Sequence, residues 1–110
     1  MPDLFAMSCL RSIDTGVTNT VIWVSAGVPS GADSHLGPRL WVVIGDSIHP
    51  HGLKQAVCVT LTSAPEVLGT LPPEIAGQVV SFIEANRVVL LDYWHAESST
   101  REMLAGLEPI

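Results

Sequence analysis

The chain is poor in basic residues and in long apolar runs. Only five of its 110 residues are lysine or arginine, so it has no stripe of positive charge to follow a phosphate backbone, and we expect no direct nucleic-acid binding. No apolar run approaches the roughly 18 residues of a membrane span, so we expect no membrane partner. The N-terminal residues lack the basic region that opens a signal peptide, which predicts a cytoplasmic protein.

Cysteine is also scarce, and its placement favours no redox or metal chemistry. Cys9 and Cys58 are far apart and fit no metal or redox spacing, so two buried thiols are favoured over a disulfide. Cys58 with a histidine is a candidate thiol nucleophile, but its place in an alternating β pattern favours a small core residue. Gly45-Asp46-Ser47 resembles a hydrolase nucleophile block without the helix that should follow it. We therefore predict no catalytic residue.

The four histidines are the candidate metal ligands. His49 and His51 lie two positions apart in a predicted turn with Asp46 nearby, while His35 and His95 are isolated. No C-x-x-C, H-E-x-x-H or dense carboxylate cluster accompanies them. Exposed turn histidines are the favoured interpretation, and we predict neither a metal site nor a cofactor.

Residues 71–94 are the stretch that most clearly predicts a helix. Pro73 suits the first helical position, where its missing N–H costs nothing, and Glu74 in the first turn complements the helix dipole. Projected at about 100° per residue, one side of the helix is apolar and we expect it to pack on a sheet. That side consists of Ile75, Val79, Phe82, Ile83, Leu90, Tyr93 and Trp94.

Asn86 falls in the middle of this apolar side, and two interpretations compete. Either Asn86 caps a second helix after a kink, or one helix runs through and a neighbouring backbone group satisfies the amide. Leu90 and Trp94 continue the phase of Ile75 and Val79, which favours a single helix.

The rest of the chain predicts strands, turns and one short helix. The clearest strands are residues 20–26, 39–45 and 55–62, with weaker candidates at 4–10 and 66–68. Residues 14–16 predict a turn, 27–38 a polar loop, and Ser99 to Glu102 has the spacing of a capping box that opens a short helix. We expect one α+β domain over residues 1–110, with three or four antiparallel strands packed against one long C-terminal helix and a short helix after it.

Charge is distributed unevenly, and this suggests a partner-binding surface. Residues 66–110 carry seven acids against two arginines, a balance of −5 within a total of −6. On the polar side of the predicted helix we select Glu74, Gln78, Glu84 and Asp92 as candidate partner-binding residues. The alternative is an ordinary solvated face.

Apolar content gives a second reason to expect a partner. At 47% hydrophobic and 15% charged residues, the composition suggests that a protein partner or a second copy, in a homodimer, covers some apolar surface. Trp23, Trp41 and Trp94 are either core residues, which we favour, or an aromatic binding surface.

Five segments of the chain form one pattern: residues 37–42, 56–62, 65–69 and 100–110, and the most specific of them, Ala85-Asn86-Arg87-Val88-Val89-Leu90-Leu91-Asp92-Tyr93-Trp94. Together they resemble small bacterial proteins of a domain-of-unknown-function type, found in toxin–antitoxin-like or mobile loci. The resemblance covers residues 37–110 and implies an α+β fold and a bacterial or phage setting. It implies no catalytic residue.

Three functions remain open at this point. The leading hypothesis is a small non-enzymatic interaction protein that acts through protein–protein contacts. The alternative is an acidic inhibitor that imitates nucleic acid and blocks a host defence nuclease such as a CRISPR effector. A small hydrolase using Cys58 or the turn with His49 and His51 is the third.

Overall fold

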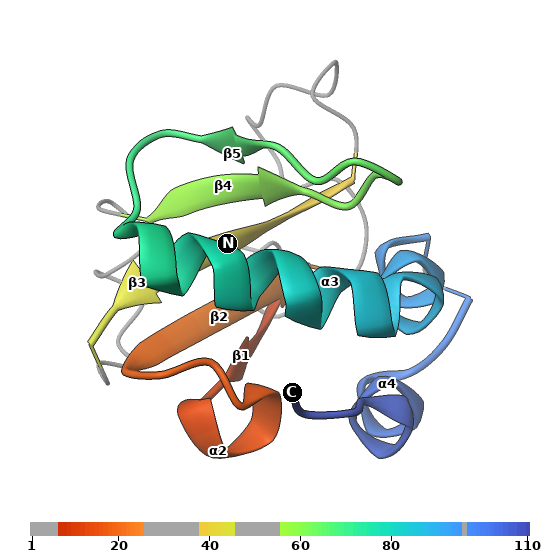
Figure 1. Cartoon of the computed structure of the whole chain (residues 1–110). Coiled ribbons are helices and arrows are strands. Elements are labelled where there is room, and N and C mark those ends of the chain that lie inside the picture. Colours follow the sequence, from red (N-terminus) through yellow and green to blue (C-terminus); the bar gives the residue numbers. More distant parts are fainter. Residues whose placement is uncertain (1–6, 26–37, 46–55, 96) are drawn as a thin grey trace.

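A five-stranded antiparallel sheet and one long helix dominate the structure, a computed structural model that describes residues 7–25, 38–45, 56–95 and 97–110. The strands lie in the sheet in the order in which they occur in the chain. They are β1 (Met7–Leu10), β2 (Thr20–Ser25), β3 (Arg39–Ile44), β4 (Val57–Thr60) and β5 (Val67–Leu68). Helix α3 (Pro73–Trp94) lies across one face of the sheet, and helix α4 (Thr100–Gly106) packs near its C-terminal end (Figure 1).

The α+β class, the long helix and the short helix after it are confirmed, but the predicted number of strands was wrong. The sheet has five strands instead of three or four because both weak candidates, β1 and β5, pair at its edges. β1 has four residues and β5 only two. Segments this short have too few alternating positions for the sequence to predict a strand clearly. Their pairing with the neighbouring strand stabilises them.

Between β1 and β2 the predicted turn is a single helical turn, α2 (Ser12–Thr15). The Asp14 carboxylate accepts the Arg11 backbone N–H at 2.9 Å, and Gly16 ends the turn in the left-handed conformation with φ of 79°. The Ile110 N–H donates to the Thr15 carbonyl at 2.9 Å. A side chain at Gly16 would therefore collide with the Ile110 backbone as well as strain its own.

Helix α3 is one continuous helix, as the hydrophobic phase predicted. Asn86 is only 2% exposed, and its amide is satisfied by backbone groups: Nδ2 donates to the Phe82 carbonyl at 3.0 Å and to the Glu108 carbonyl at 2.8 Å. Its Oδ1 accepts the Glu108 N–H at 2.7 Å. A polar residue in the middle of an apolar face thus fixes the chain that follows α4 against α3.

The main core fills the space between α3 and the sheet. From the helix it includes five buried residues of the predicted apolar side, with Ile75 half-buried at the margin. Trp94, also predicted on that side, is buried outside this cluster and stacks on Trp41. In β4 the alternation is as predicted: Val57 and Val59 face this core, while Cys58 lies on the other side. Tyr93 adds a polar link, because its hydroxyl lies 3.0 Å from Ser8 Oγ in β1 and 2.9 Å from Thr100 Oγ1 in α4.

Candidate functional site

The side of α3 that faces away from the sheet is the first candidate surface. Its exposed residues recur every three or four positions, so they form a single line along the helix, here called the outer stripe. The outer stripe consists of Glu74, Gly77, Ser81, Glu84, Ala85 and Val88. Val88 is 69% exposed, which is unusual for a valine in the middle of a long helix.

Gly77 lies in the outer stripe, where glycine makes the helix less stable than alanine would. No contact within the described residues explains why a glycine is there. In the interior of an exposed helix, glycine is less favourable than alanine by about 1 kcal/mol. A Cβ at Gly77 would meet nothing within 4 Å, so the glycine makes no room for a neighbouring part of this chain. Ser81 and Ala85 follow at four-residue intervals, so small side chains continue along the helix.

The four predicted partner-binding residues do not share one environment. Glu74 and Glu84 are exposed in the outer stripe, and Asp92 is half-buried near the end of α3. Gln78 is half-buried, and its side-chain oxygen accepts the Thr18 N–H at 2.8 Å. Gln78 therefore joins the helix to the segment between α2 and β2.

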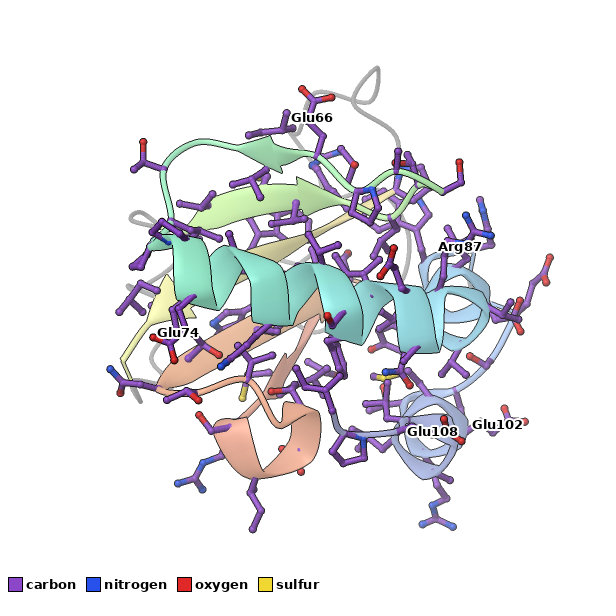
Figure 2. The ribbon with its side chains drawn as sticks, in the orientation of Figure 1. Glu66, Glu74, Arg87, Glu102 and Glu108 are labelled. Carbon is purple, nitrogen blue, oxygen red and sulfur yellow. The ribbon has the colours of Figure 1, made fainter. Side chains whose placement is uncertain are left out.

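A small polar hollow lies beside the outer stripe. It has a volume of about 200 Å³ and is lined by Thr62 and Ser63 after β4 and by Glu84 and Arg87 on α3. Other acidic residues of this half of the chain are spread out: Figure 2 shows Glu66 next to β5, Glu74 at the start of α3, and Glu102 and Glu108 at α4. Glu84 is thus a carboxylate of the outer stripe that also borders a concave surface.

The opposite face of the sheet carries a different set of side chains. Cys9, Trp23, Trp41 and Cys58 are directly opposite one another across β1 to β4, and we call these four residues the tryptophan row. Neighbouring strands are about 4.8 Å apart, so three strand spacings separate the two thiols by roughly 14 Å, too far for a disulfide. Both cysteines are free and half-buried.

Arg39 and Trp94 contact the tryptophan row at Trp41, one of its two inner members. Trp94, the last residue of α3, stacks on Trp41 with ring centroids 6.3 Å apart. The Arg39 guanidinium lies 5.4 Å from the Trp41 ring centroid and 5.5 Å from that of Trp94. Arg39 is only 3% exposed, so these cation–π contacts are shielded from water and connect the helix end to β3.

The surroundings of Cys58 do not favour a thiolate nucleophile. Burial raises the pKa of the Cys58 thiol above its ordinary value, and the positive charge and hydrogen bond of nearby Arg39 only partly oppose this rise. Thiol nucleophiles need the opposite shift, because the thiolate is the reactive form. The direction of this shift argues against the nucleophile, but the prediction of two buried core thiols was also wrong, because Cys9 and Cys58 are half-buried.

Neither Trp23 nor the described histidine, His95, supports a catalytic hypothesis. Trp23 is buried, and its Nε1 has no hydrogen-bond partner, which leaves a donor that ordinarily finds one. His35, His49 and His51, with the proposed turn and the Gly45-Asp46-Ser47 block beyond Gly45, lie outside the described residues. His95 is exposed at the end of α3. Within the described part of the chain, no three histidine, cysteine or acidic side chains gather as metal ligands would.

Sequence reasoning missed three of these features. Val88 and Gly77 fall on the polar side of the helical projection, so a reading that searched that side only for charge passed over them. The contact of Arg39 with Trp94 joins residues 55 positions apart, and no local pattern predicts it.

Among the described helices, none is both long and apolar enough to cross a bilayer. No protein-family model, curated protein or solved structure matches the chain.

Proposed function

We propose that the protein is a small non-enzymatic binding module that recognises a protein partner through the outer stripe of α3. One observation carries the proposal: the outer stripe exposes a valine and a glycine between carboxylates on the longest helix. Val88 offers apolar area to a partner, and Gly77 allows a partner's backbone to come close. The setting that we propose is a toxin–antitoxin-like or mobile locus of a bacterium or phage.

The charges indicate the chemistry of that partner. Glu74 and Glu84 lie in the outer stripe and Asp92 lies one turn beyond Val88, so an acidic partner would be repelled and a basic segment attracted. From Glu74 to Asp92 the helix is about 27 Å long at 1.5 Å per residue. A basic amphipathic helix of five turns matches this length and can place small or apolar residues over Gly77 and Val88. A second copy of this acidic chain fits less well.

The test compares a variant of the outer stripe with a matched variant outside it. The partner is first captured by cross-linking in the native host and identified, and its affinity for the purified chain is then measured. Glu84→Lys with Val88→Asp should weaken binding at least tenfold, because one change reverses the charge and the other places a carboxylate in the apolar contact.

The matched control is Glu97→Lys with Leu104→Asp. Glu97 and Leu104 are exposed, as Glu84 and Val88 are, but they lie after α3 and on α4. This control should bind as the unmodified chain does. Equal affinity of the outer-stripe variant and the unmodified chain would remove the outer stripe from the proposal.

Gly77→Ala provides a second measurement that separates binding from folding. In the free protein we expect a gain of up to about 1 kcal/mol in the free energy of unfolding, because alanine favours the helix and its Cβ meets open space. Binding should weaken, since the added methyl group keeps the partner away. A variant that is more stable and binds equally well would show that no backbone approaches this position.

The nucleic-acid mimic remains the second candidate, and the same captured partner distinguishes the two. If the partner is a nuclease and added duplex DNA displaces the chain from it, the acidic surface imitates phosphates. Glu66 and Glu74 lie apart from each other and from Glu102 and Glu108 at α4 (Figure 2), and this spread of charge favours the helix-mediated contact over the alternative.

A further inference from the structure

A second hollow lies where the chain leaves β1, forms α2 and returns as β2. It has a volume of about 300 Å³ and is lined by Arg11, Ser12 and Ile13 on one side and by Thr20 and Val21 on the other. Pockets that hold small molecules begin at about this size. The hollow belongs to neither the outer stripe nor the tryptophan row.

Two of the five described lining residues, Ile13 and Val21, are apolar. Val21 is 1% exposed, whereas Ile13 on α2 is 85% exposed, the highest value among the large hydrophobic residues of the described chain. An isoleucine left in water on a four-residue helical turn contributes nothing to the core. A ligand in the hollow would cover part of it, and each apolar carbon removed from water would favour binding.

The polar groups indicate the sign of the charge that the ligand carries. The Ser12 hydroxyl donates to the Thr20 carbonyl at 3.1 Å and accepts the Thr20 N–H at 3.2 Å, so it is engaged within the fold. Asp14 uses one carboxylate oxygen to accept the Arg11 backbone N–H. Arg11 is the charged residue among the described lining residues, and a guanidinium can bind a carboxylate through two parallel hydrogen bonds.

We infer that this hollow binds a small monocarboxylate with an apolar body, whose carboxylate pairs with Arg11 and whose hydrocarbon part covers Ile13. The inference is independent of the proposed partner on α3. It is argued from a concave surface of sufficient volume, one highly exposed apolar side chain and an arginine among the lining residues.

Octanoate is the probe for the test, added to the isotope-labelled full chain while backbone amide signals are followed by NMR. Saturable shifts should be confined to residues 11–13 and 20–21. Octylamine, which has the same chain length with the opposite charge, should bind at least tenfold more weakly. Arg11→Gln should weaken octanoate binding at least tenfold, and Ile13→Asn several-fold, while Arg101→Gln, a change at an exposed arginine of α4, should have no effect.

Three outcomes would overturn the inference: shifts that do not saturate, equal binding of octanoate and octylamine, or unchanged binding by Arg11→Gln. Arg11 and Ile13 are both exposed, so their variants should fold, and an unchanged urea midpoint verifies this. If Arg11→Gln does unfold the chain, Arg11→Lys keeps the charge but removes the paired donors, and it should bind octanoate more weakly than the unmodified chain.

Discussion

The two faces of the sheet are stabilised by different means. On the side of α3, fifteen buried residues form one continuous apolar cluster, and Asn86 is its polar member on the helix. On the opposite side, the described cluster has three buried residues, Val21, Trp23 and Val43. Beside it are two free thiols and the stacked Trp41, Trp94 and Arg39. Apolar area stabilises the first side, and a few specific contacts stabilise the second.

This difference has a consequence for how the molecule tolerates change. In a large, close-packed aliphatic cluster a truncated side chain leaves a cavity that its neighbours fill only in part, so the loss of stability is large. A set of a few aromatic and charged groups depends on individual contacts, and the effects of its substitutions are expected to be smaller, local and sensitive to charge and pH. The following experiments test that contrast.

The largest effect should come from Asn86→Ala on the α3 side. The change removes three hydrogen bonds and leaves the Glu108 backbone groups without their partner. We expect the free energy of unfolding to fall by about 2–3 kcal/mol in urea denaturation. Ser81→Ala on the exposed side of the same helix should change it by less than about 0.5 kcal/mol. A loss no larger than that of the control would mean that the amide contributes little to stability.

Two neighbouring residues of β3 permit a direct comparison of the faces. Val42 faces α3 and is 1% exposed, and Val43 faces the other way and is 6% exposed. Val42→Ala should cost about 2 kcal/mol and Val43→Ala about half as much, because half-buried neighbours can move into the smaller space. Equal losses, measured by thermal or urea unfolding, would show that both faces are equally well packed.

The contact between Arg39 and Trp41 can be isolated by a double-mutant cycle. Arg39→Met and Trp41→Leu each remove several interactions, but the cycle retains only the energy that couples the two residues. We expect a coupling of about 1 kcal/mol, because the buried guanidinium lies over the ring away from water. A coupling near zero, with both single variants folded, would assign the burial of Arg39 to its other contacts.

The smallest effect is a pH dependence from Cys58. Because burial raises the pKa of the folded thiol above its unfolded value, the folded state keeps the proton longer. The contribution of the Cys58 thiol to the free energy of unfolding is therefore fully present below the unfolded pKa. It is lost as pH rises through the folded pKa. In a Cys9→Ser background, the thiol should react slowly with a thiol reagent near pH 7. Arg39→Gln should raise its pKa further, and rapid reaction at neutral pH would contradict the assignment.

Helix α3 was predictable because it is long and periodic, and because Pro73 marks its start. The single helix through Asn86 and the capping box, in which Ser99 Oγ accepts the Glu102 N–H at 3.1 Å, also followed from local chemistry. β5 was only a weak candidate, since two residues carry no period. The hollow at Arg11 and the contact of Arg39 with Trp94 were not predictable, because they depend on the path of the chain in space.

The hydroxyl of Tyr93 sets an order of events during synthesis. Its contact with Ser8 joins residues separated by 85 positions, and its contact with Thr100 lies later still. Because the chain leaves the ribosome from its N-terminus, β1 emerges long before Tyr93 is made, and its polar anchor is missing for most of that interval. β1 can pair with β2 well before that, so the contact between Ser8 and Tyr93 is added to a strand that already has its ladder partner and is among the last long-range contacts to form.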